Sequence, residues 1–99
     1  MDYILTFNNY CEIYLKGKNV SFSNAKTKQQ RITEFKWGLD ELTNKIKENF
    51  SEQINSLTSM AFKDGYGDMA ALNLELQNSL RDQLRNFRAK QEQRSGLYD

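Results

Sequence analysis

The sequence predicts an all-α fold: a long antiparallel helical hairpin with a shorter N-terminal amphipathic helix, in an elongated three-helix architecture. Three observations predict it: two long apolar stripes at helical spacing, a glycine-bearing break between them, and no proline among 99 residues. Proline in a helix interior removes a hydrogen bond and clashes with the preceding turn, so its absence permits very long helices. A chain of this length is expected to form one small domain over residues 1–99.

The first expected element covers residues 3–16. Its apolar side chains fall within about 140° of arc at 100° per residue, which is typical of an amphipathic helix; they are Tyr3, Ile4, Phe7, Tyr10, Cys11, Tyr14 and Leu15. The aromatic residues of this set, with Phe22, are expected in the core. Helix is favoured because the aligned apolar residues outweigh propensity, and a β-hairpin over residues 3–22 is the alternative.

The second expected element covers residues 24–62. Its apolar stripe has a mean spacing of about 3.6 residues, the period of a straight α-helix; it comprises Ile32, Phe35, Leu39, Leu42, Ile46, Phe50, Ile54, Leu57 and Ala61. Ser23 or Thr27 is the expected N-cap, and Thr27 with Gln30 has capping-box spacing. Gly38 lies in mid-helix, where it permits either a close crossing or a kink. We expect the helix to continue through it.

The break covers residues 63–68, where Gly65 and Gly67 can take positive φ and Asp68 suits the next N-cap. A third helix is expected over residues 68–93, on a stripe with the same mean spacing of about 3.6; this stripe comprises Met69, Leu72, Leu76, Leu80, Leu84 and Phe87. The tail, residues 94–99, is expected to fray.

Element lengths then constrain the packing. The third helix is shorter than the second, and we expect the N-terminal helix to fold back through residues 17–23 and cover the first third of the second helix. Trp37, Met60, Phe62 and Leu74 lie beside the stripes. Apolar side chains left outside a core usually form a second interface, so a homo-oligomer is expected.

Charge is distributed unevenly although the net charge is only +1. Residues 16–36 carry six bases against one acid, residues 37–80 three against seven, and residues 81–94 five against two. An antiparallel hairpin brings the two basic segments toward one end of the molecule. Arginine suits phosphate and carboxylate groups because its planar fork donates two hydrogen bonds. The candidate interaction surface therefore comprises Lys26, Lys28, Arg31, Lys36, Trp37, Arg81, Arg85 and Arg88.

Composition also bounds the chemistry. The sequence has no histidine, the commonest metal ligand and the commonest general base near neutral pH. A thin helical protein also has little volume for a ligand pocket. We therefore expect no catalytic residue, no metal and no cofactor. Asp64 and Asp68 are expected to serve as turn residues, because the break lacks the run of oxygen ligands that a calcium loop needs.

The sequence therefore predicts a non-enzymatic protein-interaction module: an adaptor, regulator or inhibitor of a larger complex. Abundant Asn and Gln are typical of AT-rich coding, as in many bacteriophages and mobile elements. Two alternatives are a sequence-independent nucleic-acid binder that uses the basic end, and a structural subunit of a larger assembly. The single cysteine and the absence of a secretory signal or membrane span in the first residues favour the cytoplasm, which is the host cytoplasm for a phage-encoded protein.

Overall fold

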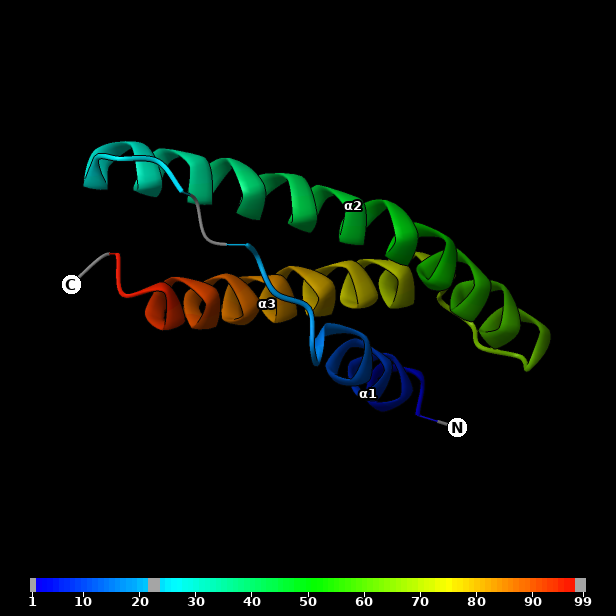
Figure 1. Ribbon diagram of the computed structural model, residues 1–99. Coiled ribbons are helices and arrows are strands. Elements are labelled where there is room, and N and C mark those ends of the chain that lie inside the picture. Colours follow the sequence, from blue (N-terminus) through cyan, green and yellow to red (C-terminus); the bar gives the residue numbers. More distant parts are fainter. Residues whose placement is uncertain (1, 22–23, 98–99) are drawn as a thin grey trace.

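The computed structural model describes residues 2–21 and 24–97, which fold into three helices. They are α1 (Tyr3–Leu15), α2 (Lys28–Lys63) and α3 (Met69–Ser95). The all-α prediction is confirmed, and the β-hairpin alternative is wrong for residues 3–15, which are helical. Helices α2 and α3 form the antiparallel hairpin, and the rod measures 57 × 18 × 18 Å (Figure 1).

Each helix begins at a side-chain cap. The carboxylate of Asp2 accepts from the Leu5 amide at 3.0 Å, and that of Asp68 from the Ala71 amide at 3.0 Å. Thr27 caps α2 by accepting from the Gln30 amide at 3.1 Å. The helix therefore begins at Lys28 rather than near residue 24, and the alternative cap, Ser23, lies outside the described residues. The side-chain oxygen of Asp or Thr accepts from one of the amides that have no partner at a helix start, which explains why these residues are the N-caps.

The break and the C-terminal end both use glycine in the left-handed region. Gly65 has φ +88°, and beyond it the Tyr66 amide donates to the Ala61 carbonyl at 2.9 Å. Helix α3 runs to Ser95 and is capped by Gly96, with φ +69°. Leu97 then packs against the core. Helix α3 therefore extends two residues beyond the expected end at residue 93. The expectation that the tail frays stays a prediction, and residues 98 and 99 lie outside the described part.

The apolar stripes of the sequence form the core. The α2 stripe is buried or half-buried along its length, with Phe35, Leu39, Ile46 and Phe50 almost fully enclosed. Opposite them lies the α3 stripe, buried from Leu72 to Phe87. Removing this apolar surface from water is the main driving force for the hairpin.

Helix α1 packs on the half of the hairpin that contains the bend, not on the first third of α2 as the sequence suggested. The hydroxyl of Tyr3 donates to the Asp64 carboxylate at 2.5 Å, and its ring lies edge-on to Tyr66. The rings of Phe7 and Tyr14 contact Phe50, with centroids 5.7 and 5.0 Å apart. Helix α1 therefore starts near the bend and ends against the middle of α3, beside Gln83 and Asn86 (Figure 1).

The linker after α1 takes the place that the sequence analysis gave to α1 itself. It passes over α3 and reaches the start of α2 (Figure 1). The Val20 amide donates to the buried side chain of Gln91 at 3.0 Å, and Gln91 donates back to the Lys18 carbonyl at 3.3 Å. Val20 also packs beside Gly38, where an added Cβ would lie 3.1 Å from its Cγ1. Gly38 thus leaves α2 continuous, as predicted, and admits the linker rather than another helix.

Gly38→Ala is therefore expected to fail to stabilise the protein, although alanine is favoured over glycine in a helix by about 1 kcal/mol. The added methyl meets Val20, whose position is fixed by Gln91. In a Val20→Ala background the same substitution is expected to raise the free energy of unfolding by about 1 kcal/mol. Urea unfolding of the wild type, the two single variants and the double variant measures both effects. Equal stabilisation in both backgrounds would show that Val20 does not restrict Gly38.

Candidate interaction surfaces

A groove with a basic lining runs between α2 and α3. Two pockets of about 410 and 250 Å³ form it and share Lys47 and Arg81 in their walls. Its lining comprises Thr43, Lys47, Ser51, Ile54, Asn55, Gln77, Leu80, Arg81, Leu84, Arg85 and Arg88. We call it the arginine groove, and the side of the hairpin that carries it the open face.

The arginine groove lies on the side of the hairpin away from α1. Helix α1 ends against Gln83 and Asn86 of α3 and donates no residue to the groove. At 3.6 residues per turn, Gln83 and Arg81 lie on nearly opposite sides of α3. The open face is therefore left uncovered by the chain's own N-terminal segment.

In the described part of the chain, the lining of the arginine groove has four bases and no acid. Arg88 pairs with Asp40, 2.8 Å away at the end of the groove, and donates to the Thr43 hydroxyl at 3.3 Å. Arg81 lies 4.0 Å from Asp82, an exposed pair that contributes little energy. Within the described residues, Lys47 and Arg85 have no ion-pair partner. An anionic group in this groove would meet donors from both helices.

The sequence placed Arg81, Arg85 and Arg88 on one helix face, and the structure brings them together in one groove. Lys47 was missed. Its signal is its spacing, because Thr43, Lys47 and Ser51 follow one another by one turn beside the apolar stripe of α2. Only the register of the hairpin shows that this row faces the arginines.

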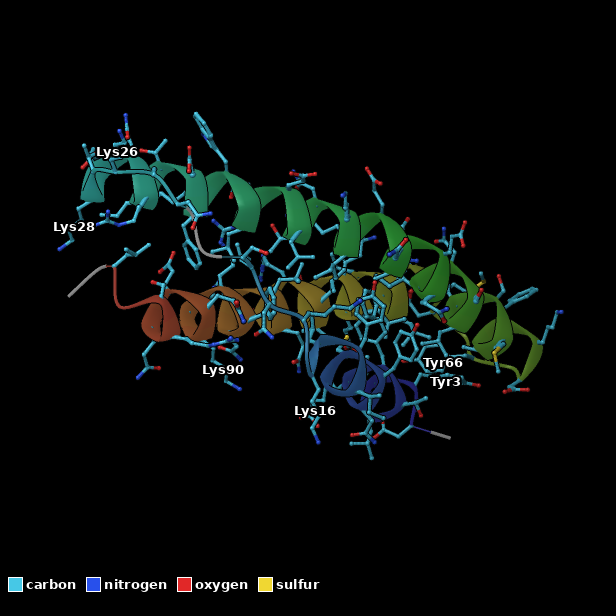
Figure 2. All side chains as sticks on the ribbon, viewed as in Figure 1. Tyr3, Lys16, Lys26, Lys28, Tyr66 and Lys90 are labelled. Atoms are coloured by element: carbon cyan, nitrogen blue, oxygen red, sulfur yellow. The ribbon has the colours of Figure 1, made fainter. Side chains whose placement is uncertain are left out.

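The other predicted residues lie apart from the arginine groove, at the start of α2. Arg31 donates to the carbonyls of Ala25 and Lys26, both at 3.1 Å, so it orders the residues before α2. Lys26 and Lys28 lie at this end (Figure 2). Lys28 and Lys36 each have an interaction partner within the chain. Trp37 is 67% exposed and borders a pocket of about 540 Å³ that Lys26 also lines.

The two basic segments do meet, but through residues that the sequence analysis did not select. Lys16 and Lys18 from the first segment and Lys90 from the second line one pocket of about 480 Å³ on the α1 side. Figure 2 shows Lys16 at the end of α1 and Lys90 on α3. Lys18 also lies 4.9 Å from the centroid of the Tyr14 ring, and Arg94 donates to Asn19. The linker, which crosses α3, causes this arrangement.

Several large apolar side chains stay exposed, as the sequence suggested for Trp37, Met60, Phe62 and Leu74. Leu5 and Ile13 on the outer side of α1 join them, whereas Tyr3, Phe7 and Cys11 of the same helix are buried. Exposed apolar side chains on all three helices are surface that another protein can cover.

Two groups near the bend and under α1 have raised pKa values. The hydrogen bond from Tyr3 to Asp64 raises the pKa of the Tyr3 hydroxyl, with burial adding to it. Burial, with a smaller effect from the Glu12 carboxylate, raises the pKa of the Cys11 thiol to about 12. Cys11 is fully enclosed in the core, where it packs as a small apolar side chain, as its place in the apolar stripe of residues 3–16 predicted.

Cys11 is expected to react with a thiol reagent at least about a hundred-fold more slowly in the folded protein than in urea, because the thiolate is the nucleophile. Since its folded pKa lies above the usual value of about 8.5, its contribution to stability is complete below pH 8.5. It is lost as the pH rises toward 12. The reaction rate at pH 8, followed by absorbance with and without urea, measures the first effect; equal rates would contradict an enclosed thiol.

Within the described residues, no group of acidic and cysteine side chains is placed to hold a metal ion. No helix in that part of the chain is both long and apolar enough to cross a bilayer. Comparison with protein-family models, with curated proteins and with solved structures finds no match to this chain.

Proposed function

We propose that this protein is a non-enzymatic helical interaction module, an adaptor, regulator or inhibitor of a larger complex, that binds other protein chains along its open face. The arginine groove is the observation that supports this most. Its four bases lie on a side of the hairpin that α1 and the other described residues leave uncovered. Such a surface attracts carboxylates, and bases from two helices fix the orientation of what binds.

Apolar side chains beside the groove favour a protein partner over a nucleic acid. At helical spacing, Phe62 lies on the same side of α2 as Ser51 and Asn55, and Leu74 follows the row of Gln77 and Arg81 on α3. Phe62 and Leu74 are 62% and 59% exposed. Aromatic side chains and arginine are the residues most enriched at protein–protein contacts.

Capture from an extract of the source organism tests this function. The wild-type chain is expected to retain a protein partner, and Arg81→Glu/Arg85→Glu to retain at least about ten-fold less of it, because like charges then face the partner. Lys16→Glu/Lys90→Glu is the matched control, with the same charge change on the α1 side. Equal retention by the two variants would remove the open face as the site of contact.

The alternative, a sequence-independent nucleic-acid binder, uses the same groove. It predicts binding to any single-stranded oligonucleotide that weakens steeply with salt. Binding would be lost when Arg81, Arg85 and Arg88 become alanine. Among the residues that the structure describes, no aromatic side chain lines the arginine groove to stack on a base, which disfavours this alternative. We also propose that the protein acts in the cytoplasm, and a structural subunit of a larger assembly is the remaining alternative.

A further inference from the structure

We infer that the partner on the open face is a second copy of this chain, and that the outer ridge of α2 from one copy lies along the arginine groove of the other. This inference rests on the proposed function, because it takes the open face as the contact surface. It adds the identity of the occupant, the residues in contact and the symmetry.

The outer ridge of α2 is convex and acidic, so it is complementary to the arginine groove, which is concave and basic. We define the outer ridge by five of the exposed side chains that fall within about 80° of arc on α2 at about 100° per residue; they are Trp37, Glu41, Glu48, Glu52 and Phe62. The acids occupy the middle and the aromatic rings the two ends. Glu41 pairs with Lys45 at 3.2 Å, whereas Glu48 and Glu52 have no ion-pair partner within the described residues.

The register of the hairpin places the acids of the ridge at the heights of the arginines. Asn73 donates to the Thr58 hydroxyl at 3.2 Å and Arg88 to the Thr43 hydroxyl at 3.3 Å. From the first contact to the second, the residue number rises on α3 by the same amount as it falls on α2. The two helices therefore keep one register between these contacts. It sets Glu48 level with Gln83, between Arg81 and Arg85.

A two-fold axis parallel to the rod would bring the acids of one copy and the arginines of the other together. Such an axis brings together positions of equal height, so Glu48 of each copy meets the Arg81–Arg85 pair of the other. Glu48 and Glu52 are one turn apart, about 6 Å, as are Arg81 and Arg85. Both contacts form at once, because ridge and groove lie on adjacent sides of α2. The contact is isologous and closed, which is the commonest form of protein dimer.

Several observations favour a second copy over other occupants. The ridge is acidic and the groove is basic, their charged side chains have the same spacing, and they lie at similar heights along the rod. Both surfaces belong to this chain. The three acids of the ridge would also repel the phosphates of a polynucleotide.

Molar mass by light scattering over a dilution series tests the inference, with two charge-reversal variants. The wild type is expected at twice the 11.6 kDa of one chain. Arg81→Glu/Arg85→Glu and Glu48→Arg/Glu52→Arg are each expected to be monomeric, with dissociation constants at least about a hundred-fold higher, because both contacts then join like charges. All four positions are exposed, and circular dichroism checks that the helices persist.

An equimolar mixture of the two variants gives the sharpest result. Each contact then joins opposite charges again, so the mixture is expected to recover the dimer mass. The matched controls, Lys16→Glu/Lys90→Glu and Glu12→Arg/Glu75→Arg, are expected to stay dimeric. A monomeric wild type, dimeric single variants or a mixture that stays monomeric would overturn the inference.

Failure of this inference is distinct from failure of the proposed function. A monomeric wild type that still captures a different protein through Arg81 and Arg85 would overturn the second copy alone. A monomeric wild type that binds a single-stranded oligonucleotide through the same arginines would overturn both and support the nucleic-acid alternative.

Discussion

Replacing Phe50 with alanine is expected to lower the free energy of unfolding by about 3–5 kcal/mol, the usual cost of removing a buried aromatic ring. Phe50 is 1% exposed. Its ring contacts Phe7, Tyr10 and Tyr14 of α1, with centroids 5.7, 5.2 and 5.0 Å apart. The substitution therefore leaves a cavity in the hairpin and also removes the surface on which α1 docks. In a domain this small, that is a large part of the total stability.

Ile13→Ala is the control, since it also truncates a large apolar side chain, but one that lies outside the core and outside the outer ridge of α2. Ile13 is 75% exposed, so the change in the free energy of unfolding is expected within about 0.5 kcal/mol. Urea unfolding followed by circular dichroism measures both variants. Similar losses for the two substitutions would mean that α1 does not pack around Phe50.

Gln91→Leu is expected to lower the free energy of unfolding by about 1–3 kcal/mol, because it leaves the half-buried Val20 amide without an acceptor. Gln91 is buried on α3 and accepts from the Val20 amide at 3.0 Å while it donates to the Lys18 carbonyl at 3.3 Å. Leucine fills similar space but supplies neither bond. The linker is then expected to detach from α3 more readily, which frees Gly38 from Val20.

Gln93→Leu serves as the control, because Gln93 is exposed on the same helix. Native-state hydrogen exchange separates the two expected effects. The Val20 amide is expected to exchange at least about ten-fold faster in Gln91→Leu and unchanged in Gln93→Leu. Protection of Val20 that survives loss of Gln91 would show that another group holds the linker.

Most of the fold could be predicted from the sequence because helical periodicity reports directly on burial. The apolar row from Ile32 to Ala61 faces inward as its spacing indicated, and Asp68 and Gly65 mark the bend where expected. Gly38, ambiguous by propensity, was correctly assigned to a continuous helix. These features depend on neighbours within one or two turns, which is the range over which sequence patterns act.

The position of α1 could not be predicted, because an amphipathic stripe shows which side of a helix is buried but not which surface buries it. Length suggested the uncovered start of α2, whereas the rings of Phe7, Tyr10 and Tyr14 pack around Phe50 instead. Contacts between aromatic rings favour this site beyond the area they bury. The described linker residues, 16–21 and 24–27, form no helix or strand, and Val20 packs beside Gly38 on α2, toward the part that seemed to need a helix.

The arginine groove could be predicted only in part, because helical spacing shows which residues share a side of one helix but not which residues of another helix face them. Arg81, Arg85 and Arg88 share a side by helical spacing alone, so the sequence identified them. Their neighbours Lys47 and Asp40 come from α2, and only the register of the two helices brings them into contact. Arg31 looked like part of a basic patch, yet it bonds two carbonyls of its own chain.

The open face is the side of the hairpin away from α1, so its assignment requires that α1 packs on the half of the hairpin that contains the bend. Proton nuclear Overhauser effects test this packing directly. Effects are expected between the ring protons of Tyr14 and Phe50 and between those of Phe7 and Phe50, whose centroids lie 5.0 and 5.7 Å apart. Effects that join Phe7 to Ile32 or Phe35 instead would place α1 on the first third of α2. The face assigned to partners would then no longer be defined.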